Sequence, residues 1–325
     1  MSRIVPVSGV VLACLLGAAG TVSADAILTS GPVTLGVNEG GGLIGASPEG
    51  EYVGLAYAGL GDALTPGCFC ESWGVSGDTV EGINYAGFLS GIEIDSFAST
   101  ATTATSVVHL TDLSELQVTQ AYAPAPGAPT ALFEDIVTIA NLSDAAISDV
   151  RYARAMDWDV PPTEFSEFVT IQGLPAAALL FSSDDGFSAA LPLSSVGDAL
   201  DPATINANFS DNGPADHGSL FIFGFGDLAA GESRTFSIFY GATASEPDAL
   251  AALGAVGAEV YSLGQSSGGE ATGEPGTFIF AFKGVGGTPF PPPTPAPETP
   301  VVPEPGSLLL LGAGLAGTAW IRRKR

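Results

Sequence analysis

Short runs of alternating apolar and polar residues, separated by Gly, Pro, Asn and Asp, recur from residue 26 to about residue 287. Such a run predicts a β-strand with one buried face, because successive side chains of a strand point to opposite sides of the sheet. In one of them, Ile92 and Ile94 alternate with Glu93 and Asp95. The clearest runs are GIEIDSFAS, SELQVTQAY, FEDIVTIAN, SLFIFGFGDL, RTFSIFYGA and GTFIFAFKG. About a dozen strands are expected, which predicts an all-β fold with a large antiparallel β-sandwich over residues 25–287.

One segment of this body, residues 246–263, has a helical pattern instead. Ser245 is placed as an N-cap and Pro247 lies in the first turn. Apolar residues follow at helical spacing, namely Leu250, Leu253, Val256, Val260 and Leu263. We expect one short helix here, with its apolar stripe packed on a sheet.

The first 24 residues have the layout of a secretory signal peptide. Arg3 is followed by an uncharged stretch from Ile4 to Gly20 and by small residues that end at Ala24. Cleavage after Ala24 is expected, with Ala26 as the alternative, and either cleavage removes Cys14. The body should therefore be exported, with Cys68 and Cys70 as its remaining cysteines.

The C-terminal end of the chain predicts a spacer followed by a membrane segment. Proline is too dense over residues 288–302 for a sheet or a helix, so an extended spacer is expected. Residues 306–321 are uncharged and would span about 24 Å as a helix, slightly less than a hydrocarbon core. Trp320 would lie at the membrane interface, and the basic cluster after it would stay in the cytoplasm, namely Arg322, Arg323, Lys324 and Arg325.

This tail resembles the PEP-CTERM sorting signal of exported bacterial proteins, because Pro303, Glu304 and Pro305 precede the apolar segment and the basic cluster. The resemblance covers residues 303–325. It implies recognition by an exosortase, a membrane protease that removes the tail near the Pro-Glu-Pro. It also implies export across the inner membrane of a Gram-negative bacterium that makes exopolysaccharide, transient anchoring, and then a place at the cell surface or outside it. An ordinary stop-transfer anchor is the alternative reading.

The charge of the body excludes one class of partner. Only Arg151, Arg154, Arg234 and Lys283 lie between the basic residues of the two ends, in a chain with 35 acidic residues. So acidic a surface repels phosphate backbones, and nucleic acid is not expected as a partner. Divalent cations would be attracted, although solubility outside the cell also accounts for the charge.

The candidate site lies in the run RYARAMDWDVPPTEFSEF, which resembles segments of other tailed proteins of unassigned activity. If residues 149–160 form a strand, Asp157 and Asp159 share one face at about 7 Å and Trp158 lies on the other. The plainest expectation is that Arg151 and Arg154 pair with these carboxylates. The alternatives are a cation site and an acid–base pair, with Trp158 stacking on a sugar.

Two further features bear on a metal site. The loops FSSDDGFSAA and FSDNGPADHG have the composition of calcium-binding loops, which makes Asp184 and Asp185 further candidate Ca²⁺ ligands, although ordinary turns also account for them. Cys68 and Cys70 are expected as free buried thiols. A disulfide between them or a shared soft metal is the alternative, since a one-residue spacing closes a tight ring.

No motif of a nucleophilic, phosphoryl-transfer or zinc hydrolase accompanies these residues. We therefore expect no enzymatic activity, but an exported surface or matrix component with a structural or binding role. A carbohydrate-binding or carbohydrate-active sandwich acting on exopolysaccharide is the alternative, and it rests on Asp157, Trp158 and Asp159.

Overall fold

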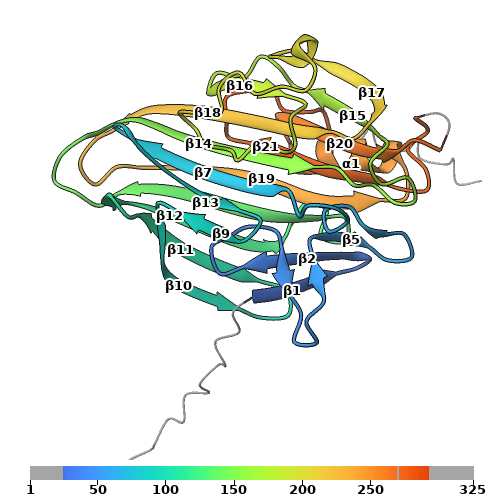
Figure 1. Ribbon diagram of the computed structural model, residues 1–325, viewed down its shortest axis with the longest axis horizontal. Coiled ribbons are helices and arrows are strands. Elements are labelled where there is room, and N and C mark those ends of the chain that lie inside the picture. Colours follow the sequence, from blue (N-terminus) through green and yellow to red (C-terminus); the bar gives the residue numbers. More distant parts are fainter. Residues whose placement is uncertain (1–24, 269–270, 293–325) are drawn as a thin grey trace, which may run out of the picture. The chain divides into compact units, whose positions relative to one another are not determined.

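The computed structural model describes residues 25–268 and 271–292, and these form an antiparallel β-sandwich (Figure 1). The larger sheet has nine strands, in the spatial order β10 (Ile92–Ser99), β11 (Ala104–Leu110), β12 (Leu113–Pro124), β13 (Leu132–Asn141), β19 (Ser233–Thr243), β21 (Thr277–Lys283), β20 (Val260–Ser266), β15 (Glu167–Gln172) and β17 (Phe209–Ala215). The second sheet has six, in the order β16 (Leu179–Ser183), β18 (Gly218–Leu228), β14 (Ile147–Asp157), β7 (Glu71–Gly77), β8 (Val80–Tyr85) and β9 (Phe88–Ser90).

Two small sheets and two helices complete the described part of the chain. The four-stranded sheet contains β1 (Asp25–Ser30), β2 (Val33–Asn38), β5 (Leu55–Tyr57) and β6 (Gly61–Asp62), and β3 (Gly45–Ala46) pairs with β4 (Tyr52–Val53). The helices are α1 (Glu246–Val256) and a short 3₁₀ turn, η1 (Pro202–Thr204). The predicted all-β sandwich is confirmed, and each of the six clearest runs forms a strand.

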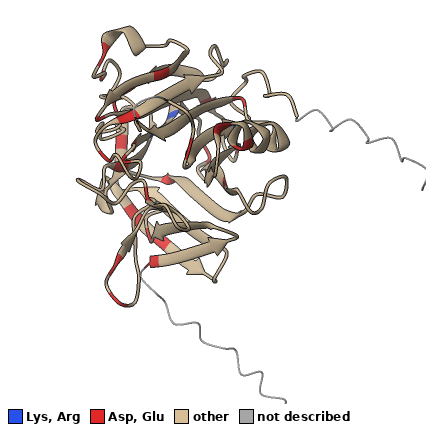
Figure 2. Ribbon diagram, turned by 90° about the vertical axis from the view of Figure 1, so that its right-hand side faces the viewer, with Lys and Arg blue, Asp and Glu red and all other residues tan. Residues whose placement is uncertain are grey.

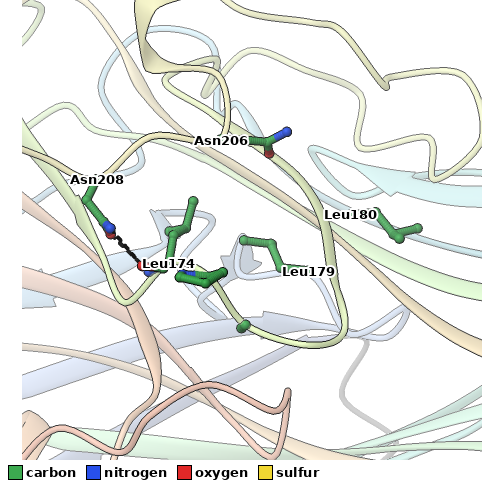
Figure 3. A pocket seen from close by; sticks show the side chains of 7 residues that line it. Leu174, Leu179, Leu180, Asn206 and Asn208 are labelled. Carbon is green, nitrogen blue, oxygen red and sulfur yellow. Dashed lines mark hydrogen bonds between the residues drawn. The ribbon is translucent and has the colours of Figure 1, made fainter.

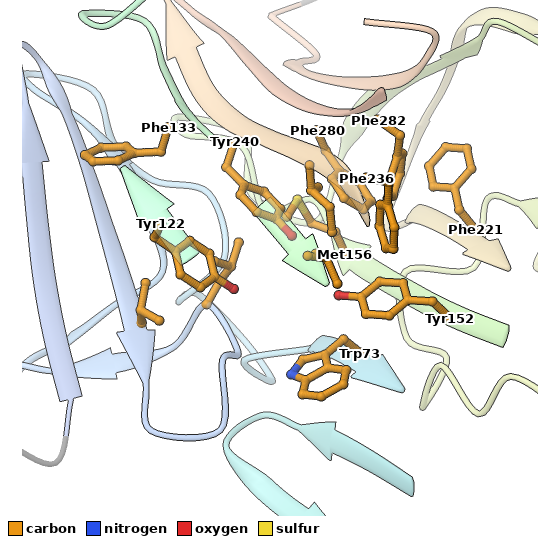
Figure 4. Packing of buried hydrophobic residues seen from close by; sticks show 14 of the residues in the cluster. Trp73, Tyr122, Phe133, Tyr152, Met156, Phe221, Phe236, Tyr240, Phe280 and Phe282 are labelled. Atoms are coloured by element: carbon orange, nitrogen blue, oxygen red, sulfur yellow. The ribbon is translucent and has the colours of Figure 1, made fainter. Parts of the chain in front are cut away.

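The main core lies between the two large sheets and is rich in aromatic side chains (Figure 4). Phe221 of β18 meets Phe280 of β21 edge to face, with ring centroids 5.6 Å apart, and Phe223 lies 4.7 Å from Phe282. Aromatic pairs in these arrangements add to the free energy gained from area burial alone. The core therefore holds the two sheets face to face.

The central strands are buried on both faces, which simple alternation did not predict. Ala153 and Ala155 of β14, on the outer face of the six-stranded sheet, form a second buried cluster with Ala190 of the loop that follows β16. On the other side of the molecule, α1 packs on Phe239 and Ile279 of the nine-stranded sheet. Each large sheet thus has a covered outer face.

The helix is shorter than predicted. Ser245 caps it as expected, with its Oγ accepting a hydrogen bond from the Asp248 N–H at 3.4 Å. The helix ends at Val256 because Gly257 takes a left-handed conformation, with φ of 68°, which glycine adopts without steric cost. Val260 and Leu263 belong instead to β20, where both pair with β21 and Leu263 also pairs with β15.

One predicted alternation fails in β10, an edge strand of the nine-stranded sheet. Ile92 is buried, but Ile94 is 37% exposed. Ile94 still pairs in regular register with Val108 of β11, but β10 has a neighbouring strand on one side only, so the side chains of this edge strand are covered less completely than those of central strands.

Acidic residues are spread over strands and loops of the body, whereas basic residues are sparse (Figure 2). Within the described part of the chain, no helix is long and apolar enough to cross a membrane.

Candidate functional site: a buried carboxylate cluster

The candidate site forms where three neighbouring strands of the six-stranded sheet meet at one edge. β14 runs antiparallel to both β7 and β18, with Met156 opposite Glu71 and Asp157 opposite Gly218. The end of β14 therefore lies beside the beginnings of β7 and β18. This arrangement brings residues 68–70, 157–159 and 216–217 together, although they are far apart in the sequence.

Backbone hydrogen bonds fix residues 157–159 after the strand ends. Asp157 N–H donates to the Cys70 carbonyl at 3.0 Å, and Asp159 N–H donates to the Ala63 carbonyl at 3.0 Å. Between them, Trp158 N–H donates to the His217 carbonyl at 3.3 Å. The extended conformation continues beyond β14, so the side chains still alternate.

Trp158 points into the core and not toward solvent. It is fully buried, its Nε1–H donates to Ser262 Oγ at 3.1 Å, and its ring lies 6.4 Å from that of Phe278. The indole therefore cannot stack on a sugar, and this part of the carbohydrate hypothesis is wrong. Since Trp158 faces the core, Asp157 and Asp159 are both directed to the opposite side.

The two aspartates are joined there by Asp216, from the turn between β17 and β18. One carboxylate oxygen of each of the three lies within 4.8 Å of the others. Asp157 and Asp159 are only 3% and 1% exposed, whereas Asp216 is exposed. Oδ1 of Asp157 and both carboxylate oxygens of Asp159 are buried without a hydrogen-bond partner. We call these three residues the carboxylate cluster.

The cluster has an unusual electrostatic environment. Burial, and then the charges of Asp159, Asp216 and Asp185, raise the pKa of Asp157 to about 8. Burial, and then the charges of Asp216, Glu164 and Asp62, raise the pKa of Asp159 to about 7. Carboxyl groups with such pKa values keep protons near neutral pH unless a cation displaces them.

Glu167, the first residue of β15, shares this environment. Its Oε1 accepts a hydrogen bond from the Val160 N–H at 3.2 Å, while Oε2 is buried without a partner. Burial first, with additional effects of Asp159 and Asp216, raises its pKa to about 8. The sequence analysis did not single out Glu167 or Asp216, although Asp216 lies in one of the loops with a calcium-binding composition.

The expected pairing of these aspartates with arginine is wrong. Arg154 Nε lies 2.6 Å from Glu71 Oε1 in the core, and Arg151 pairs with Asp149 at 2.7 Å. Strand geometry gives the reason: Arg154 and Asp157 are on opposite faces, and Arg151 is six residues, or roughly 20 Å, from Asp157. Over residues 25–268 and 271–292, no basic side chain forms an ion pair with the cluster.

The geometry of the cluster suits a hard divalent cation. Calcium binds oxygen ligands at about 2.3–2.6 Å, so two ligands of one ion are at most about 5 Å apart. The cluster meets this limit, and it offers buried oxygens that no protein group satisfies. A cation would compensate both the missing hydrogen bonds and the mutual repulsion of the carboxylates.

Asp184 and Asp185 do not join this group. Asp184 Oδ1 accepts hydrogen bonds from Leu200 N–H at 3.0 Å and Thr204 Oγ1 at 2.9 Å, and its Oδ2 lies 3.6 Å from His217 Nδ1. Burial opposes ionisation of Asp184. The hydrogen bonds to its carboxylate, above all that from His217, outweigh burial and lower the pKa of Asp184. Asp185 Oδ1 accepts the Phe187 N–H at 3.1 Å, as in an ordinary turn.

Cys68 and Cys70 form a disulfide, so the expectation of free thiols is wrong. Both residues lie in the loop that precedes β7, where Cys68 is exposed and Cys70 is buried. Cys68 Sγ lies 3.6 Å from Asp157 Oδ2, and Cys70 Sγ lies 3.0 Å from the hydroxyl of Tyr85. The disulfide therefore borders the carboxylate cluster.

Two cavities lie on this half of the body. One, of about 290 Å³, is lined by aliphatic side chains with Asn206 and Asn208, and the Asn208 amide is bonded to the backbone of Leu174 (Figure 3). The other, of about 240 Å³, is lined by polar residues that include Asp216 and His217. Neither cavity is lined by Asp157 or Asp159, so these carboxylates do not face a substrate-sized cleft there.

The fold and the site together define an acidic β-sandwich with a buried carboxylate cluster. Comparison with known protein families adds the sorting signal: residues 301–325 match the PEP-CTERM protein-sorting motif. The chain is thus an exported protein that is sorted by exosortase, with transient membrane anchoring before it reaches the surface. No curated protein matches the chain, and the likeness of the body to other tailed proteins stays a prediction.

Several predicted features lie outside the described residues. These are the signal peptide over residues 1–24, the Pro-Glu-Pro at 303–305, and the apolar segment with Trp320 and the basic residues 322–325.

Proposed function

We propose that this protein is a cell-surface or extracellular-matrix component of a Gram-negative bacterium, in which the β-sandwich has a structural or binding role and is stabilised by Ca²⁺. The observation that carries the proposal is the carboxylate cluster of Asp157, Asp159 and Asp216, with buried, unpartnered oxygens and no basic partner among the described residues. Outside the cell, Ca²⁺ is available as the compensating charge.

The energetic argument has two parts. Ionising the cluster without a cation leaves like charges close together in a poorly solvated place, which destabilises the folded state. A cation that binds the folded state alone stabilises it by about 2.7 kcal/mol when its concentration is 100 times its Kd. Export and Ca²⁺ binding are therefore consistent with each other, because the cluster would bind its cation outside the cell, where the folded body needs the added stability.

The experiment is thermal unfolding of the full chain in mild detergent, in Ca²⁺ and in NaCl at matched ionic strength. Screening by salt acts on any acidic protein and should give equal shifts in the two solutions. A specific site predicts a larger increase of Tm in Ca²⁺, and this increase should be absent in Asp159→Asn. Glu51→Gln, which removes one charge from an exposed loop, is the matched control and should behave like the wild type.

Equal shifts of Tm in Ca²⁺ and NaCl, or an undiminished Ca²⁺ effect in Asp159→Asn, would contradict the proposal. A carbohydrate-active role is supported less well. The raised pKa values of Asp157 and Asp159 suit an acid, but a polysaccharide cannot reach side chains that are 3% and 1% exposed without a rearrangement. Release of reducing sugar from exopolysaccharide, lost in Asp157→Asn, would favour that role.

A further inference from the structure

A second set of metal-binding atoms meets at Asp157. The Sγ atoms of Cys68 and Cys70 and one carboxylate oxygen of Asp157 all lie within 4.8 Å of one another. Asp157 therefore belongs to two different groups of potential ligands, one with two further aspartates and the other with two sulfurs. Its Oδ2 is the oxygen nearest Cys68, and its Oδ1 has no hydrogen-bond partner.

In the disulfide form, the sulfur side of this arrangement is a poor ligand, because metal ions bind the thiolate and not the disulfide sulfur. Reduction would supply two thiolates next to a carboxylate. Thiolates select soft and borderline cations such as Zn²⁺, whereas a set of carboxylates suits Ca²⁺. The chemistry of the site thus depends on the state of the two cysteines.

We infer that reduction of the Cys68–Cys70 disulfide creates a metal site, formed by both thiolates and the Asp157 carboxylate, that takes Zn²⁺ or a similar borderline cation. The inference shares Asp157 with the proposed Ca²⁺ site but does not require Ca²⁺ to bind. Solvent completes the coordination, as in other zinc sites with three protein ligands.

The reduction step needs a dithiol as reductant. The S–S bond breaks, two electrons and two protons pass from the dithiol to Cys68 and Cys70, and the sulfurs of the dithiol form their own disulfide. Zn²⁺ then displaces the two thiol protons into solvent.

The surroundings of the cysteines suit this sequence of events. Cys68 is exposed, so a dithiol can attack its sulfur and release Cys70 as the first leaving thiolate. The Tyr85 hydroxyl lies 3.0 Å from Cys70 Sγ and can donate a hydrogen bond to the thiolate formed there.

The test uses the full chain in mild detergent with a Cys14→Ser background, so that Cys68 and Cys70 are the only cysteines. One sample stays oxidised, and another is reduced with dithiothreitol and desalted under argon. Both are titrated with Co²⁺, because a cobalt–thiolate bond gives a charge-transfer absorption that carboxylate ligands do not give. The reduced sample should show this band, saturating at one Co²⁺ per chain and lost when Zn²⁺ is added; the oxidised sample should not.

Variants separate this inference from the proposed Ca²⁺ site. Cys68→Ala should abolish the band, and Asp157→Asn should weaken Co²⁺ binding by at least the roughly 10–100-fold typical of losing an outer-shell partner. Asp159→Asn is the matched control: it removes a ligand of the Ca²⁺ site alone and should keep the band. Circular dichroism checks that each variant is folded, and Cys68 is an exposed residue of the loop before β7.

A band in the oxidised sample, no band after reduction, or full Co²⁺ affinity in Asp157→Asn would overturn the inference. Loss of the band in a folded Asp159→Asn variant would do the same. None of these results depends on whether Ca²⁺ raises Tm, so failure of one proposal is distinguishable from failure of the other.

Discussion

Asp157 and Asp159 must lose their protons before they can bind Ca²⁺, so the affinity of the carboxylate cluster for Ca²⁺ should rise steeply with pH. Their pKa values in the absence of a cation are about 8 and about 7, raised first by burial and then by neighbouring carboxylates. If the pair titrates with these two values, its doubly ionised fraction is nearly complete at about pH 9 and about 10⁻³ at about pH 6. The Kd for Ca²⁺ should therefore be ~10³-fold weaker at the lower pH.

Isothermal titration calorimetry measures both the Kd and the protons released. Titrations at each pH in two buffers with different enthalpies of protonation give the proton count from the difference in heat. We expect the release of about two protons per Ca²⁺ at about pH 6 and close to none at about pH 9. Asp159→Asn should bind Ca²⁺ more weakly and release fewer protons, whereas Glu51→Gln should match the wild type.

A Kd that is the same at both pH values, or a proton count near zero at the lower pH, would refute this reasoning. Either result would mean that Asp157 and Asp159 are already ionised at low pH or that Ca²⁺ binds elsewhere.

The other predictions concern stability and processing. Without Ca²⁺, the free energy of unfolding should fall as pH rises from about 6 to 9, because the folded state holds protons on the cluster that the unfolded state has already lost. The expected slope is about −1.4 kcal/mol per pH unit for each such proton. Urea unfolding at each pH measures this free energy. Arg154→Met should cost about 3–5 kcal/mol in the same assay, because it leaves the buried Glu71 carboxyl without its ion-pair partner. Arg151→Met, at a partly exposed ion pair, should cost no more than about 1 kcal/mol. The mature protein from its native host should lack residues 1–24 and the segment after about Pro305, which a measurement of its intact mass checks. A species that retains the basic terminus would indicate a permanent anchor.

The strands were predictable because alternation is a local property. The side chains of Leu116 and Val118 face the core as the sequence indicates, and the same period of two correctly placed Asp157 and Asp159 on one face. Ile94 shows the limit of this reasoning, since it is exposed on an edge strand, and the position of a strand in the sheet is not a property of the local sequence.

The rest of the site depends on strand order. Asp216 reaches the cluster because β18 begins beside the end of β14, and no local pattern reveals which distant strands become neighbours. The sequence could have shown that Arg154 does not pair with Asp157, since a period of two already places the two side chains on opposite faces of the strand. Its actual partner is Glu71 of β7. This pair could not be predicted, because the local sequence does not show that β7 lies beside β14.

The most direct test of the central claim is a crystal structure of the protein grown in Ca²⁺, with anomalous differences recorded to locate the ion. Our account predicts an anomalous peak between the carboxylates of Asp157, Asp159 and Asp216, with Ca–O distances of about 2.3–2.6 Å. It also predicts that the peak disappears in Asp159→Asn crystals grown in the same solution. No peak at these residues, or calcium bound only elsewhere on the acidic surface, would contradict it.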